Sequence, residues 1–88
     1  MPEISRFLGI IIRMFFGDHA PPHFHAYYED FEASFSIDKL ELISGNLPPR
    51  VKGLVIEWAT MHKGALMKNW GLITDKKSPS FEKIKPLV

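Results

Sequence analysis

The chain has 88 residues, of which 45% are hydrophobic and 24% are charged, and it contains no cysteine. A chain of this length builds one modest hydrophobic core, so we expect a single domain over residues 1–88. The lack of cysteine excludes disulfide scaffolds, thiol nucleophiles and thiolate metal sites, and it favours a cytoplasmic location. No apolar run approaches the roughly 20 residues that span a bilayer, so we expect no membrane attachment.

Charge is distributed unevenly, although the formal net charge is only +1. Residues 1–45 carry three basic and seven acidic side chains, whereas residues 46–88 carry eight basic and three acidic ones. A basic half can attract phosphate groups, but such charge runs are more often the solvated surface of helices. The basic half offers no recognition-helix arrangement. We therefore expect at most weak nucleic-acid binding and no sequence-specific DNA binding.

The first predicted strand covers residues 9–16, which are rich in β-branched and aromatic side chains and end at Gly17. A register that keeps Arg13 out of the core places Ile10, Ile12 and Met14 inside. Ile11, Arg13 and Phe15 then lie on the opposite face.

Two hairpins follow if the chain reverses at Glu29-Asp30 and again at Asp38-Lys39. Residues on the apolar face are then Phe24, Ala26, Tyr28, Phe31, Ala33, Phe35, Ile37, Leu40 and Leu42. The opposite face, called the histidine face below, collects His23, His25, Tyr27, Glu32, Ser34, Ser36 and Glu41. Arg13 lies beside His25 in this register. Large apolar side chains among these polar groups, such as Ile11, Phe15 and Ile43, predict that the histidine face is a contact surface.

A helical region is predicted from Pro48-Pro49 to about Thr74, because prolines suit the first helical turn. Its apolar residues recur at steps of three and four: Val51, Leu54, Val55, Trp58, Met61, Ala65, Leu66, Trp70 and Ile73. Interior glycines, each costing about 0.5–1 kcal/mol relative to alanine, predict a break near Lys63-Gly64. Residues 81–87 could add a short edge strand, although Pro86 limits its pairing.

These elements predict a two-layer α+β domain. We expect an antiparallel sheet of three or four strands, with one kinked helix or two helices packed on one face.

The segment from Asp18 to His25, of sequence DHAPPHFH, carries the most distinctive chemistry, and three interpretations of it stay open. In the first, the Pro-Pro turn is a rigid loop whose imidazoles hydrogen-bond to backbone and to carboxylates such as Asp18 or Glu41. In the second, His23 and His25 lie about 6.5–7 Å apart on one strand and flank a phosphodiester as acid and base. Arg13 or Lys39 would hold the phosphate, as in a ribonuclease or phosphodiesterase that uses His23 and His25.

The third interpretation is a metal site formed by His19, His23 and His25, with Asp18 or Glu41 as a fourth ligand. The spacing H-x3-H-x-H is weak support for it. A ligating histidine also needs an outer partner for its second nitrogen, and the sequence identifies none. The sequence therefore predicts no tightly bound metal and no cofactor.

Several short motifs resemble one bacterial family. They are Pro2–Phe7, Gly17-Asp18-His19, Pro21–Ala26, Glu57-Trp58, Asn69-Trp70 and Ile84–Leu87. Together they resemble the family catalogued as domain of unknown function 4160. The resemblance implies a small protein without an assigned activity, often encoded beside a second small protein, as in toxin–antitoxin pairs.

The leading hypothesis is an interaction module of such a pair. On this hypothesis the histidine face, with His19, Tyr27, Glu41 and Asp18 as contact residues, meets a small protein partner or a second copy of the chain.

Overall fold

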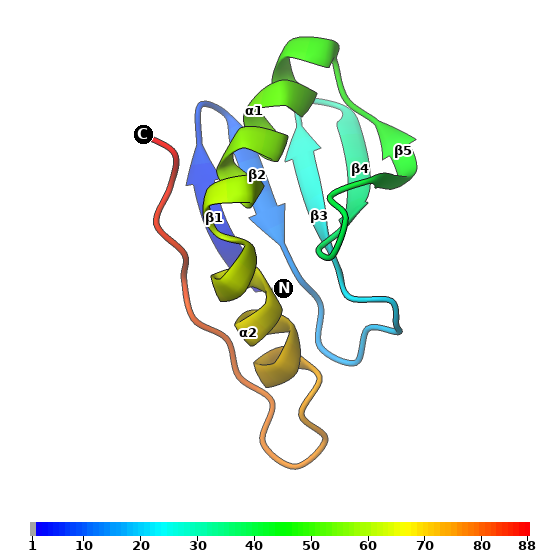
Figure 1. Cartoon of the computed structure of the whole chain (residues 1–88), viewed down its shortest axis with the longest axis vertical. Coiled ribbons are helices and arrows are strands. Elements are labelled where there is room, and N and C mark those ends of the chain that lie inside the picture. Colours follow the sequence, from blue (N-terminus) through cyan, green and yellow to red (C-terminus); the bar gives the residue numbers. More distant parts are fainter. Residues whose placement is uncertain (1) are drawn as a thin grey trace.

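The computed structural model describes residues 2–88, which form a five-stranded antiparallel sheet followed by two helices (Figure 1). The elements are β1 (Glu3–Phe7), β2 (Ile10–Arg13), β3 (His23–Tyr28), β4 (Phe31–Ser36), β5 (Leu42–Asn46), α1 (Pro49–Met61) and α2 (Lys63–Ile73). Strands neighbour one another in chain order, and every neighbouring pair is antiparallel. The predicted α+β class is confirmed, but the predicted count of three or four strands is wrong. Over residues 2–88, neither helix is long and apolar enough to cross a membrane.

Strand β1 is the strand that the sequence analysis missed. It joins β2 through a two-residue turn in which Leu8 and Gly9 both have positive φ, 51° and 80°. Two-residue hairpin turns favour positive φ, and Gly9 adopts it without strain, but Leu-Gly is a weaker signal than Asn-Gly. An irregularity in the β1–β2 register also buries Ile4 and Ser5 consecutively, which hides the alternation typical of a strand.

The predicted registers of β2 with β3 and of β3 with β4 are confirmed, whereas that of β4 with β5 shifts between Ser34 and Phe35, and Leu42, predicted to be inside, is exposed. Arg13 lies opposite His25, and His25 lies opposite Ser34, so all three side chains share one face. Phe24 lies opposite Phe35 on the other face, and both are fully buried. The predicted strand at residues 9–16 is shorter in the structure, because regular pairing ends at Arg13.

Both helices pack against the face of the sheet that carries Phe24 (Figure 1). Helix α1 begins at Pro49, as predicted, and the two helices are separated at His62, next to the predicted break. Trp58 is fully buried and its ring lies 6.1 Å from that of Phe24. The interruption at His62 shifts the phase of the apolar stripe. Ala65, predicted to be inside, is therefore exposed, and Asn69 is buried. Met61, also predicted to be inside, precedes the interruption and is exposed at the end of α1, where Ala59 is buried.

Residues 79–88 form no strand; they pass α2 and then run beside β1 (Figure 1). The Ile84 amide donates to the Ile4 carbonyl over 2.9 Å, but Pro86 has no N–H with which to continue a ladder. Side chains from the helices hold this segment instead. The Trp58 indole donates to the Lys85 carbonyl over 2.9 Å, and the Asn69 amide makes two bonds to the Glu82 backbone, of 2.7 and 2.8 Å. The predicted edge strand is thus replaced by a segment bound through side chains.

Candidate functional site

The loop between β2 and β3 carries Asp18 to the start of β3. Gly17 has a φ of 75°, in the left-handed region that glycine adopts without strain, and the Asp18 amide donates to the Phe15 carbonyl over 3.3 Å. The Ile37 amide donates to the Pro22 carbonyl over 3.0 Å and ties the loop to the end of β4. The chain turn therefore brings the Asp18 carboxylate back over β3.

One carboxylate oxygen of Asp18 lies close to both histidines of β3. This Oδ2 atom lies 3.1 Å from Nε2 of His23 and 3.4 Å from Nε2 of His25. The three side chains are between 14% and 23% exposed, so the group is sheltered yet open to small molecules. Ligating atoms of all three residues lie within 4.8 Å of one another, as the ligands of one metal ion do. We call these three residues the Asp18 cluster.

The second nitrogen of His23 fixes where its proton lies. Nδ1 is 2.8 Å from the Pro21 carbonyl oxygen, which can only accept, so Nδ1 carries the hydrogen and donates. In neutral His23 the Nε2 lone pair then points at the Asp18 carboxylate, which is also an acceptor. Two acceptors at 3.1 Å require a cation between them, either a proton or a metal ion.

The His25 ring is held from several sides. Its Nδ1 lies 3.1 Å from the hydroxyl oxygen of buried Ser34, which can donate or accept. The Phe15 ring meets it edge-on at 4.7 Å, and the His23 ring lies at 5.1 Å. On the far side of His23, the Trp70 ring of α2 lies at 5.2 Å. These contacts orient both imidazoles toward Asp18.

Arg13 and Tyr27 extend the site along the histidine face. The Arg13 guanidinium lies 5.1 Å from the centre of the Tyr27 ring, a cation–π contact. Arg13 Nε is buried, and no described residue accepts a hydrogen bond from it. Burial raises the pKa of the Tyr27 hydroxyl above its usual value, and the negative charge of Glu32 adds to this shift.

Of the residues predicted for the site, the structure brings together Asp18, His23 and His25, with Arg13 and Tyr27 beside them. His19 and Glu41 are exposed and lie outside the Asp18 cluster. The Glu41 amide instead donates to the Ser36 hydroxyl over 3.1 Å, in the turn between β4 and β5.

Sequence reasoning missed the roles of Ser34 and Trp70. The predicted register did place Ser34 on the face of His25, so its contact with the imidazole was within reach of the sequence. Trp70 was assigned to the core, and only the fold of α2 over the end of β3 brings it to His23. The Trp70 side chain is only partly buried.

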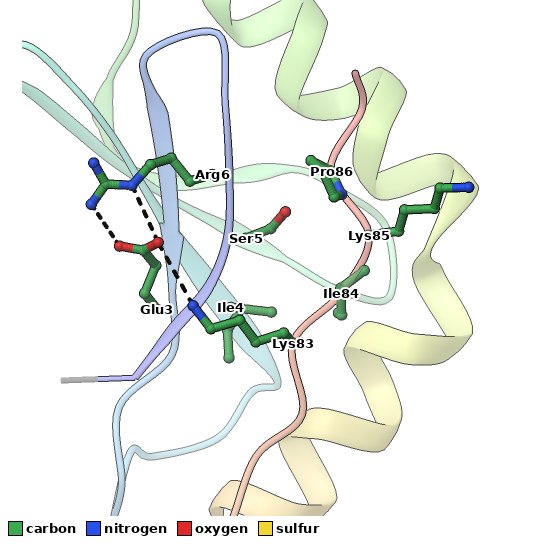
Figure 2. Close-up of a pocket in the computed structure, with 8 residues that line it drawn as sticks. All are labelled: Glu3, Ile4, Ser5, Arg6, Lys83, Ile84, Lys85 and Pro86. Carbon is green, nitrogen blue, oxygen red and sulfur yellow. Dashed lines mark hydrogen bonds and ion pairs between the residues drawn. The ribbon is translucent and has the colours of Figure 1, made fainter.

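A separate hollow of about 370 Å³ lies between β1 and the segment 83–86 (Figure 2). It is lined by Glu3, Ile4, Ser5, Arg6, Lys83, Ile84, Lys85 and Pro86 and by none of the Asp18 cluster. Arg6 and Lys83 both turn toward the Glu3 carboxylate, at 2.7 and 3.9 Å (Figure 2). The hydrogen bond from Arg6 lowers the pKa of Glu3. Two cationic side chains of the hollow, Arg6 and Lys83, are thus already paired with Glu3, which makes this hollow a weaker candidate site than the Asp18 cluster.

Comparison with curated proteins and with solved structures gives no match. A family model does match residues 9–71, a span that contains the whole Asp18 cluster and both helices up to Gly71. The match covers well over half of the chain and agrees with the resemblance carried by the proline-histidine segment. The chain therefore belongs to the family described as Domain of unknown function (DUF4160).

Proposed function

We propose that this protein binds one divalent transition-metal ion of the zinc class through Asp18, His23 and His25. The observation that carries the proposal is the convergence of two imidazole Nε2 atoms on a single carboxylate oxygen. At His23 the hydrogen is held at Nδ1, so the nitrogen that faces Asp18 is the one with a free lone pair in the neutral ring.

The distances fit an ion at the centre of the Asp18 cluster. Zinc binds nitrogen and oxygen ligands at about 2.0–2.2 Å, and tetrahedral angles then separate neighbouring ligand atoms by about 3.3–3.5 Å. The two measured separations of 3.1 and 3.4 Å lie close to that range. Each imidazole also has the outer partner that ligating histidines need, the Pro21 carbonyl for His23 and the Ser34 hydroxyl for His25.

A site of three protein ligands leaves at least one coordination position for water or a ligand, as open zinc sites do. The sequence expectation of no tightly bound metal rested on the weak H-x3-H-x-H spacing and on the lack of an outer partner, and both imidazoles have such a partner, Pro21 and Ser34. The metal-free acid–base interpretation gains less support, because the Asp18 carboxylate lies between the imidazoles. A phosphodiester placed there would meet a negative charge.

Zinc titration of tag-free protein tests the proposal, with His23→Ala as the ligand variant and His19→Ala as the matched control. His19 lies in the same loop, but it is exposed and outside the cluster. We expect one zinc per chain and a loss of affinity of about 100-fold or more in His23→Ala, because a ligand is removed. His19→Ala should bind zinc as the wild type does. Equal affinity in both variants, with circular dichroism showing both folded, would refute the site.

A second candidate function is contact with another protein chain through β5. All five residues of this edge strand are exposed, and Leu42 and Ile43 are 40% and 49% exposed. One edge of β5 has no neighbouring strand within residues 2–88. An exposed, apolar strand edge is a template for pairing with a further strand, which supports a partner contact at β5, whereas the interaction-module hypothesis from the sequence placed the partner on the histidine face.

A further inference from the structure

We infer that the metal centre accepts a phosphate group as an exogenous ligand, and that Arg13 holds the same group from the side. This inference rests on the proposed metal function, because the phosphate would occupy the coordination position that Asp18, His23 and His25 leave open. It adds a ligand class and a binding residue to that site.

Arg13 is the cation placed for this role. It lies directly opposite His25 on the histidine face, and side chains in opposite positions of an antiparallel pair have Cβ atoms about 4.5–5.5 Å apart. His23 is its diagonal neighbour, which long side chains also reach. The guanidinium itself lies over Tyr27, two residues beyond His25 on β3, so Arg13 has to turn from Tyr27 toward His23 to hold a phosphate at the metal ligands.

Arg13 has a cation–π contact with Tyr27 but no carboxylate partner within residues 2–88. None of the ion pairs within residues 2–88 includes it, and its Nε is buried without an acceptor. A buried donor of a charged group that lacks an acceptor is costly, and an oxyanion would supply one. The guanidinium matches the geometry of phosphate oxygens, to which it donates two parallel hydrogen bonds.

Metal binding makes the surface around Asp18, His23 and His25 more positive, as the binding of a phosphate requires. A divalent ion with two neutral imidazoles and the Asp18 carboxylate leaves a net charge of about +1, and Arg13 adds another. Without the ion, the carboxylate would repel the phosphate. Phosphate binding should therefore need both the metal and Arg13.

Cobalt(II)-loaded protein provides the test, because the visible spectrum of cobalt responds to a change of its ligands. Inorganic phosphate and a nucleoside 5′-monophosphate are titrated in parallel, which separates free phosphate from a phosphate ester. The variants are Arg13→Gln and, as control, Lys52→Gln, which removes an exposed positive charge on α1. Cobalt content of each sample is measured by elemental analysis.

We expect both phosphates to perturb the wild-type spectrum, and Arg13→Gln to weaken their binding about tenfold or more with unchanged cobalt content. Lys52→Gln should match the wild type. Equal phosphate affinity in Arg13→Gln and wild type, with cobalt bound in both, would overturn this inference and leave the metal centre standing. Failure of the wild type to bind cobalt would overturn both.

Discussion

Asn69 is a buried polar residue of α2 whose role becomes clear only in the folded chain. It is 2% exposed, and its side-chain amide both donates to the Glu82 carbonyl and accepts from the Glu82 amide. The segment that contains Glu82 forms no strand, so these two bonds replace a backbone ladder. Asn69 therefore anchors residues 79–88 to the helical layer.

Replacing Asn69 by alanine should lower the free energy of unfolding by about 1–3 kcal/mol, because two backbone groups of Glu82 lose their partner. The matched control is Lys68→Ala. Lys68 contacts the same Glu82 through an ion pair whose side chains are 64% and 60% exposed, and such surface pairs contribute less than about 1 kcal/mol. Urea unfolding followed by tryptophan fluorescence measures both. Equal losses in the two variants would argue against the anchoring role.

The site residues could be predicted from the sequence only in part. The two-residue spacing of His23 and His25 places both imidazoles on one strand face, and the hairpin register adds Arg13 and Ser34 to that face. The position of Asp18 depends on the path of the loop. The hydrogen bond from His23 to the Pro21 carbonyl involves a backbone atom, for which the sequence carries no signal.

Strands with a regular alternation of apolar and polar residues could be predicted from the sequence, whereas the edges of the sheet could not. The β3–β4 hairpin pairs two alternating strands of six residues, so a shift of one residue would expose its aromatic side chains. Strand β1 and the segment 79–88 lack such a pattern. Their places are set by a turn with positive φ at Leu8 and by side chains of distant helices.

Strand β5 lies at the edge of the sheet and is held close to β4. Gly45 has a φ of 73°, and any Cβ there would collide with the Glu32 carbonyl. The register shift between Ser34 and Phe35 leaves Ile43 without a partner on β4. The fold of β5 thus depends on glycine, while its exposed apolar side chains leave an edge suited to pairing.

If β5 pairs with a second copy, the wild type should show a concentration-dependent dimer in sedimentation velocity. Ile43→Lys should reduce dimer formation, because a lysine on a strand edge opposes pairing. Met67→Lys is the matched control, since Met67 is 40% exposed on α2 and Ile43 is 49% exposed on β5. A monomer at every concentration, or equal loss of the dimer in both variants, would contradict this mode of association.

In the whole molecule, both helices lie on one side of the sheet, and the segment 79–88 closes over the β1 edge (Figure 1). The histidine face is therefore left uncovered over its centre, and α2 reaches only the end of β3, where Trp70 meets His23. This arrangement shelters the Asp18 cluster on one side and leaves it accessible on the other. A site for an exchangeable ligand requires both shelter on one side and access from the other.

X-ray absorption at the zinc edge of tag-free protein loaded with one equivalent of zinc tests whether Asp18, His23 and His25 bind one metal ion. We expect a first shell of nitrogen and oxygen at about 2.0–2.2 Å, with the multiple-scattering signal of two imidazoles. His19→Ala should leave this spectrum unchanged, and His23→Ala should remove one imidazole. A first shell without imidazole, or an imidazole signal that is undiminished in His23→Ala, would contradict the proposed site.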